Sequence, residues 1–360
     1  MEMQCRQSDG IAWMRADPDA WSTVGFGAPG APSAGTGAFA LSAWSQPDLV
    51  ELVRNPNAWA GSATVDGLRF KVVADDTQRV MALQVDEVDA LAGLPVAEAN
   101  IAAAWPVRVI VEPPQQVLYL GFNQARRPWS TPACRLAVGL GLDRAALAQA
   151  AGGNAIPRAL FLATDEPAAA HMEQARATWA ECVAQQDAPI ATPIALYVPA
   201  IPRPYLADPT AFASALQAQL SEIGIETQLV STDWSTQWLP DVQAGRADLF
   251  VLGISSLNGD PGSLLCPLLC GSNAALMTGR DGLPLAPDDE LAGLLAQAQA
   301  TGDAAQRLAL YQQADGVIAQ RLPVLALSSP RTSWAIRSEW QGELIGPFDA
   351  WFGAVSRSEP

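Results

Sequence analysis

Short polar side chains gather in residues 253–261, where Ser255, Ser256 and Asn258 offer hydroxyl and amide groups. Groups of this size donate and accept hydrogen bonds, and a few of them are enough to orient a small ligand. Serine and asparagine also satisfy the backbone of their own loop in many turns. Ligand contact and loop stabilisation therefore both remain open for this segment.

Arg203 and Tyr205 lie in a proline-rich segment, residues 199–205, between a predicted strand and a predicted helix. A guanidinium at such a position can bind an anionic group through paired hydrogen bonds. A solvated arginine on the surface is the alternative interpretation. The segment is a second candidate for ligand contact.

Twelve tryptophans is a high count for 360 residues. Trp234, Trp238, Trp334 and Trp351 lie in segments that could border a cleft between two lobes. Large apolar walls with a few polar groups are typical of small-molecule sites, whereas ordinary core packing is the alternative. The tryptophans favour a ligand that is partly apolar.

Catalysis finds little support in the sequence. His171 is the only imidazole, and no serine elbow, cysteine–histidine pairing or phosphate loop accompanies it. Adjacent carboxylates such as those at 75–76 and 288–289 more often mark the start of a helix than an acid–base pair. We expect no enzyme and no cofactor, with a hydrolase that uses acidic residues as the alternative.

Five cysteines allow one or two disulfides, since Cys134 and Cys182 fall in separate segments and Cys266 and Cys270 lie four apart. Buried free thiols are the other possibility. A thiolate metal site is disfavoured because there is no second cysteine pair, and only His171 could complete a tetrahedral set. We expect no metal.

Composition excludes several classes of protein. Hydrophobic residues make up 49% of the chain and charged residues 16%, which is typical of a compact globular protein. The formal net charge of -16 leaves no basic face for a phosphate backbone, so nucleic acid is not an expected partner. No apolar run approaches the roughly 20 residues of a membrane span, and residues 1–6 carry no export signal.

The elements that must position the polar segments follow one another in α/β order. The expected elements are a strand at 193–198, a helix at 209–223 that ends at Gly224, a strand at 225–230, a helix at 234–243 and a buried strand at 247–252. Ligands of open α/β sheets bind outside the carboxyl ends of the strands. The loop at 253–261 is therefore the first place to look for function.

The rest of the chain predicts two lobes. Residues 1–36 form an irregular lead-in, residues 37–112 with 326–360 a discontinuous first lobe, and residues 113–325 a larger α/β lobe. Pro113 and Pro114 mark the expected hinge. Expected strands are 39–44, 49–53, 68–73, 88–91, 107–111, 117–122, 324–327 and 332–336, and expected helices are 76–85, 134–150, 171–185 and 288–321. The last two strands are expected to return to the first lobe.

Eight segments along the chain form an ordered series of motifs: 35–41 (GTGAFAL), 54–59 (RNPNAW), 82–89 (ALQVDEVD), 120–123 (LGFN), 135–147 (RLAVGLGLDRAAL), 219–226 (QLSEIGIE), 245–249 (GRADL) and 259–261 (GDP). This series resembles the family 5 extracellular solute-binding proteins of ABC importers, which include dipeptide-, oligopeptide- and nickel-binding proteins. The resemblance implies an α/β fold of the type II periplasmic-binding-protein kind, with two lobes and hinge closure.

Two departures from the family pattern qualify what is carried over. Family members begin with an additional stretch before the segment that matches residues 35–37, so we expect the first lobe to be incomplete. Dipeptide-binding relatives carry an aspartate that pairs with the peptide ammonium just before the segment that matches 258–261, and Leu257 stands at that position. A buried ammonium without an acidic partner costs several kcal/mol, which argues against a simple dipeptide.

The sequence thus predicts a monomeric binding protein that captures a small, partly apolar solute between two lobes and delivers it to an ABC transporter permease. A periplasmic or cell-surface location is implied by the resemblance. A truncated sensor or scaffold domain that is not coupled to transport is the alternative among binding proteins. The candidate ligand-binding residues are Asn123, Arg203, Tyr205, Trp234, Ser255, Ser256, Leu257, Asn258, Asp260 and Trp334.

Overall fold

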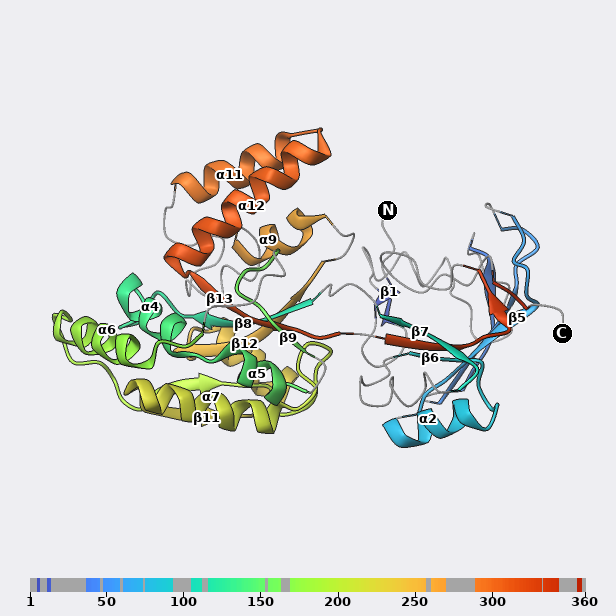
Figure 1. The fold of residues 1–360 in the computed structure, drawn as a ribbon, viewed down its shortest axis with the longest axis horizontal. Helices are drawn as coiled ribbons and strands as arrows, with labels where there is room; N and C mark the ends of the chain where they lie inside the picture. Colours follow the sequence, from blue (N-terminus) through green and yellow to red (C-terminus); the bar gives the residue numbers. More distant parts are fainter. Residues whose placement is uncertain are drawn as a thin grey trace. The chain divides into compact units, whose positions relative to one another are not determined.

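The computed structural model divides the chain into two compact units, Met1–Pro113 with Thr332–Pro360, and Pro114–Arg331. It describes residues 5–6, 12–13, 37–45, 48–58, 61–73, 75–92, 105–111, 116–152, 155–162, 169–256, 260–269, 289–331, 333–342 and 355–357. Figure 1 shows the elements of both units. None of the helices in these ranges combines the length and the hydropathy that a membrane span requires.

The second unit is built on a six-stranded sheet in the order β11-β10-β12-β8-β13-β9. The strands are β8 (Gln116–Phe122), β9 (Ile156–Pro157), β10 (Ile194–Tyr197), β11 (Thr227–Val230), β12 (Leu249–Ser255) and β13 (Val324–Ser329). Strand β10 pairs in parallel with β11 and β12, whereas β8 runs antiparallel to both β12 and β13. The carboxyl ends of β10, β11, β12 and β13 therefore meet at one edge of the sheet.

Helices cover both faces of this sheet (Figure 1). One buried cluster joins the sheet to α4 (Pro132–Gly141), α5 (Arg144–Ala150), α6 (Met172–Ala184) and α7 (Pro209–Ile223). The other cluster joins it to the π-helical turn η1 (Trp234–Trp238), α8 (Leu239–Gln243), α9 (Pro261–Leu269), α11 (Asp289–Ala300) and α12 (Ala304–Arg321). Because both faces are covered, the central strands β8, β12 and β13 are apolar except for polar residues at one end of each.

Helix α7 has the predicted bounds 209–223, and capping residues fix both of its ends. The side chain of Asp208 accepts a hydrogen bond from the backbone N–H of Ala211, which satisfies one free donor of the first turn. Gly224 ends the helix with a φ of 102°, a left-handed conformation that favours glycine. The turn at Gly224 leaves only a short connection between the end of α7 at Ile223 and the start of β11 at Thr227.

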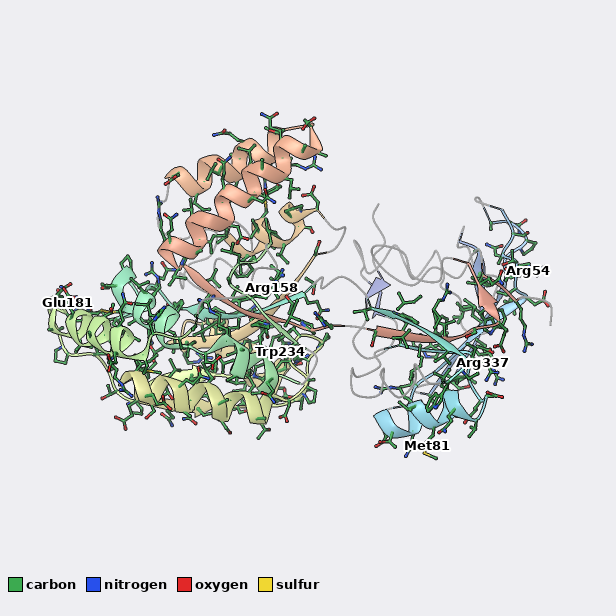
Figure 2. The ribbon with its side chains drawn as sticks, in the orientation of Figure 1. Arg54, Met81, Arg158, Glu181, Trp234 and Arg337 are labelled. Atoms are coloured by element: carbon green, nitrogen blue, oxygen red, sulfur yellow. A yellow bond between two sulfur atoms is a disulfide. The ribbon has the colours of Figure 1, made fainter. Side chains whose placement is uncertain are left out.

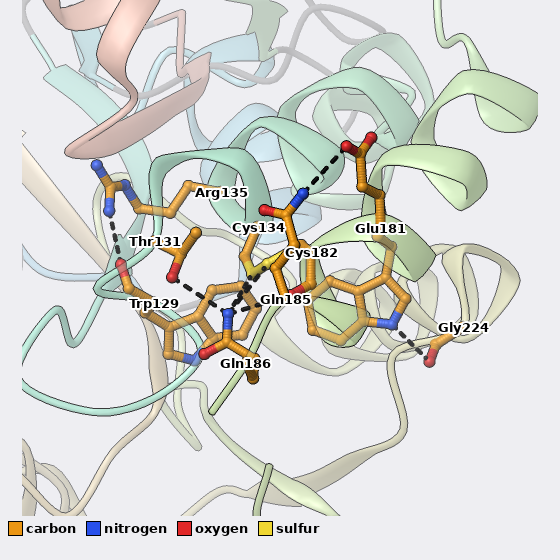
Figure 3. Close-up of a disulfide and its surroundings, with 10 residues drawn as sticks. Trp129, Thr131, Cys134, Arg135, Glu181, Cys182, Gln185, Gln186 and Gly224 are labelled. Carbon is orange, nitrogen blue, oxygen red and sulfur yellow. Dashed lines mark hydrogen bonds between the residues drawn. A yellow bond between two sulfur atoms is a disulfide. The ribbon is translucent and has the colours of Figure 1, made fainter. Parts of the chain in front are cut away.

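A disulfide joins α4 to α6 on one side of the sheet (Figure 3). Cys134 and Cys182 have Cα atoms 5.5 Å apart, within the usual range for a disulfide. Gln186 Nε2 donates to Thr131 Oγ1 at 3.2 Å and to the Cys182 carbonyl at 3.1 Å beside it. This pairing was one of the two that the sequence left open, and Cys266 is a free thiol.

The first unit contains two three-stranded antiparallel sheets and one helix in its described part. The first sheet has the order β3 (Phe39–Ser45), β4 (Leu49–Arg54), β5 (Gly67–Lys71), and the second has the order β6 (Ala90–Ala92), β14 (Ser333–Arg337), β7 (Val107–Val111). Helix α2 (Asp76–Gln84) packs its Leu83 against Leu91 and Ala335. Short pairs β1 (Cys5–Arg6) with β2 (Ala12–Trp13), and β15 (Trp340–Gln341) with β16 (Ser356–Arg357), complete the strands.

Several sequence-based expectations about the elements are wrong. Strand β13 lies inside the sheet of the second unit, between β8 and β9, rather than returning to the first lobe. Strand β12 continues three residues beyond 252, to Ser255. The single helices expected at 134–150 and 288–321 are each two helices, because Asp143 and Asp303 cap a new helix within each range.

Candidate functional site

The edge of the sheet where the parallel strands end collects three segments that carry candidate residues. Residues 198–206 leave β10, residues 231–238 leave β11, and Ser256 leaves β12. These segments come from widely separated parts of the sequence, and the parallel pairing brings their starting points together. The edge therefore holds Arg203, Tyr205, Trp234 and Ser256 in one region of a single unit.

Arg203 and Trp234 form the centre of this region. The guanidinium carbon of Arg203 lies 4.1 Å from the centroid of the Trp234 ring, which is a close cation–π contact. The Trp234 ring in turn stacks on Trp238, with centroids 4.5 Å apart and an interplanar angle of 13°. Trp234 is labelled in Figure 2, where it lies beside the sheet of the second unit. Three side chains thus form one continuous stack.

Arg203 differs in its electrostatic surroundings from those arginines of the second unit that form ion pairs. Arg126, Arg246 and Arg307 each form an ion pair with an aspartate. Within the described ranges no carboxylate forms an ion pair with Arg203, and its buried Nε has no hydrogen-bond partner there. Asp233 is near enough for Arg203 to help lower the pKa of its carboxyl, but the two side chains form no ion pair. The guanidinium can therefore pair with an anion from solution.

Tyr205 is fixed against the backbone of β12. A Cβ atom added at Gly253 would lie 2.1 Å from the Tyr205 ring, so only glycine permits this close packing. Burial raises the pKa of the Tyr205 phenol to about 12, and the nearby Arg203 opposes this shift only in part. The phenol is therefore neutral at ordinary pH and can act as a hydrogen-bond donor at the edge.

The polar residues after β12 have roles that the sequence did not separate. Ser255 is the last residue of β12 and lies opposite Gln116 of β8, so it belongs to the sheet and not to a loop. Ser256 Oγ lies 2.9 Å from Ser263 Oγ of α9. Asp260 accepts a hydrogen bond from the Gly262 N–H and forms an ion pair with Arg307 at 2.8 Å. Asp260 thus holds the start of α9 to α12, and Leu257 and Asn258 lie outside the described residues.

Asn123 and Trp334 are not brought to this edge. Asn123 follows the carboxyl end of β8, which runs antiparallel to β12, and it therefore lies at the opposite edge of the sheet. Its buried side-chain amide donates to the carbonyls of Gly245 at 3.1 Å and Ala247 at 2.8 Å. Trp334 lies on β14 of the first unit and packs against Ile336 and Val355. The structure gives both residues packing or backbone-binding roles.

Trp238 was named only among the tryptophans that could border a cleft, and Asp233 was not a candidate, yet both lie in this region. The Trp234–Trp238 spacing of four was the available signal, because it predicts two rings on one helical face. Asp233 Oδ1 accepts hydrogen bonds from the N–H groups of Ser235 and Thr236 and from the Thr236 hydroxyl, and these bonds lower its pKa. Asp233 therefore remains charged and fixes the turn that carries both tryptophans.

A separate cavity of about 340 Å³ lies among α9, α11 and α12. Its lining is polar and includes the Asp260–Arg307 ion pair, Gln299, Tyr311 and the free thiol of Cys266. Gln299 Nε2 donates to Cys266 Sγ at 2.9 Å. Within the described residues, no three His, Cys, Asp or Glu side chains gather closely enough to hold a metal ion.

The architecture is that of a type II periplasmic binding protein. The family model described as bacterial extracellular solute-binding proteins, family 5 Middle, matches residues 20–275. The chain belongs to this family, which confirms the resemblance drawn from its motifs.

Two relatives and one solved structure show the extent of the similarity. The chain is 26% identical over 342 residues to the probable ABC transporter periplasmic-binding protein SapA of Escherichia coli strain K12, covering 90% of this chain and 60% of the relative. It is 28% identical over 328 residues to the probable di/tripeptide-binding protein 5 of Pseudomonas aeruginosa strain UCBPP-PA14, covering 87% and 60%.

The crystal structure of a dipeptide binding protein from Pseudoalteromonas sp. SM9913 in complex with Met-Leu has the same fold. Its TM-score is 0.69 at 22% sequence identity, and the match covers 90% of this chain and 64% of that chain. The chain spans 60% of the length of these two curated relatives.

Proposed function

We propose that the protein captures a small solute that carries an anionic group and an apolar portion, and delivers it as a monomer to the permease of an ABC importer. The site is the edge of the second unit where β10, β11 and β12 end. The observation that carries this proposal is Arg203, which is half-buried on an aromatic stack and forms no ion pair with any carboxylate of the described residues.

The ligand class follows from the groups at the edge. A planar guanidinium binds carboxylates through two parallel hydrogen bonds, which favours an anionic group on the solute. Trp234 is half-buried and offers an aromatic edge next to Arg203, which favours an apolar portion beside that group. The relatives include proteins named for peptide binding, so a peptide-like acid fits this class.

A simple dipeptide remains a poor candidate on the argument from Leu257. The ammonium group of a dipeptide needs an acidic partner when it is removed from water. A peptide whose amino end is acetylated carries no such charge and keeps the carboxylate. We therefore propose that acetylated or otherwise uncharged amino ends are bound better than zwitterionic dipeptides.

The proposed location is the periplasm or the cell surface. Disulfides form and persist in oxidising compartments, and the Cys134–Cys182 bond supports such a location for this chain. One of the relatives is named as a periplasmic-binding protein of an ABC transporter, which supports both the location and the permease partner.

A thermal-shift panel tests this function. We expect acetyl-Ala-Ala-Phe to raise the melting temperature, with a stabilisation of about 2.7 kcal/mol at a concentration one hundred times its Kd. Its C-terminal amide, the dipeptide Ala-Phe and a neutral sugar should give much smaller shifts. A larger shift with Ala-Phe would contradict the proposed ligand class, and no shift with any acid would contradict the function.

A further inference from the structure

The side chain of Arg203 is held at one face by a pair of stacked indoles. The Arg203 guanidinium carbon lies 4.1 Å from the centroid of the Trp234 ring, and the Trp238 ring stacks on Trp234 with centroids 4.5 Å apart. Trp238 is fully buried, so the stack is anchored in the apolar cluster between the sheet and α8. The position of Arg203 is therefore coupled to the packing of two tryptophans.

The turn that carries the tryptophans is a π-helix, η1, followed directly by α8. Such turns are rare and occur often at functional sites. The backbone N–H of Trp238 donates to the backbone carbonyl of Asp233 at 2.8 Å and closes the turn. The rings of Trp234 and Trp238 are almost parallel in this turn. The wider turn thus produces the stack on which Arg203 rests.

We propose that Trp234 and Trp238 are positioning residues that hold Arg203 ready for a carboxylate and so set the preference of the site for anionic ligands. This inference rests on the proposed function and concerns the same site. Neither indole needs to touch the ligand for this role. The two indoles act by holding the Arg203 guanidinium in one position.

The physical reason is the flexibility of arginine. An arginine side chain has many rotamers, and fixing it in one of them on binding lowers its conformational entropy and weakens the affinity. When the side chain is already fixed in the folded protein, binding does not carry this entropy loss. The cation–π contact and the burial of Nε restrict Arg203 before any ligand arrives. Because Arg203 is half-buried with Nε buried, the remaining part of the guanidinium faces outward toward a ligand.

The test compares a matched pair of probes, acetyl-Ala-Ala-Phe as the free acid and as the C-terminal amide, by isothermal titration calorimetry. The Kd of the amide divided by the Kd of the free acid reports the preference for the carboxylate. Trp234→Leu should lower this ratio about tenfold, whereas Trp234→Phe, which keeps an aromatic face, should lower it about threefold or less.

Trp179→Leu is the matched control. Trp179 is a buried tryptophan of the same unit that stacks on Trp129 on the opposite side of the sheet. Its loss should lower the melting temperature and leave the Kd ratio unchanged. If Trp234→Leu also leaves the ratio unchanged while the wild-type protein prefers the acid, the positioning role is wrong.

A second measurement needs no ligand. In the nuclear magnetic resonance spectrum, the Nε–H proton of Arg203 should be shifted upfield of that of Arg127 by the Trp234 ring, and Trp234→Leu should remove this shift. If the wild-type protein binds neither peptide, the proposed ligand class fails. An upfield shift would then support only the restraint of Arg203 by Trp234, and an absent shift would overturn the positioning inference as well.

Discussion

Replacing Arg203 by glutamine is expected to weaken the binding of acetyl-Ala-Ala-Phe about 100-fold, or by about 2.7 kcal/mol. The substitution removes the positive charge that is proposed to pair with the carboxylate but keeps a polar, shorter side chain. Binding of the C-terminal amide should change little, since its terminal group carries no charge. Calorimetric titration of both peptides measures the two effects.

Arg127→Gln is the control for this substitution. Arg127 is an arginine of the same unit whose ion pair with Asp187 at 2.7 Å is largely exposed to solvent. Exposed ion pairs contribute about 0–1 kcal/mol to stability, so Arg127→Gln should alter neither fold nor binding. Equal losses of acid and amide binding in Arg203→Gln would show that Arg203 supports the fold rather than the ligand.

Removing the disulfide is expected to produce the largest loss of stability. Cys134 and Cys182 are separated by 48 residues, and closing a loop of this length restricts the unfolded chain by about 4 kcal/mol. The double variant Cys134→Ala with Cys182→Ala should therefore unfold at a clearly lower urea concentration. Tryptophan fluorescence follows this transition, since Trp129 and Trp179 belong to the same buried cluster as the two cysteines.

Chemical reduction of the wild-type protein should reproduce the loss, because it breaks the same bond without changing the side-chain volume. Cys266→Ala is the control, since Cys266 is a free thiol and its removal opens no cross-link. A reduced protein that unfolds at the same urea concentration as the oxidised protein would show that the bond does not stabilise the second unit.

The elements with strong local signals could be predicted from the sequence. The bounds of helix α7 were predicted correctly from the apolar spacing of Phe212, Leu216 and Leu220 and from Gly224 at its end. Strands β7 and β10 were predicted to within two residues from their apolar runs. Local capping and hydrophobic patterning decide such elements without help from distant residues.

The errors have a common physical cause, which is that the deciding contact lies far away in the sequence. Gly253 was interpreted as the end of a strand, but the Tyr205 ring packs on it and β12 continues to Ser255. The side-chain amide of Asn123 donates to carbonyls more than 120 residues away, contacts that its local sequence does not indicate. A single sequence does not reveal such long-range partners.

The candidate site was predictable only in part, because its residues could be chosen locally but their mutual contacts are long-range. Arg203 was proposed as a ligand contact from its position after a strand, and Trp234 was proposed separately as one of the tryptophans that could border a cleft. Their mutual contact at 4.1 Å arises only because β10 and β11 are parallel neighbours in the sheet. The sequence therefore predicted the members of the stack but not the stack itself.

The most direct test of the proposed site is hydrogen–deuterium exchange with and without acetyl-Ala-Ala-Phe. The proposed site predicts slower exchange in residues 198–206 and 231–238, the two segments that carry Arg203 and Trp234. Slower exchange confined to α11 and α12, or to the sheet of β3, β4 and β5, with no change in these two segments, would contradict it.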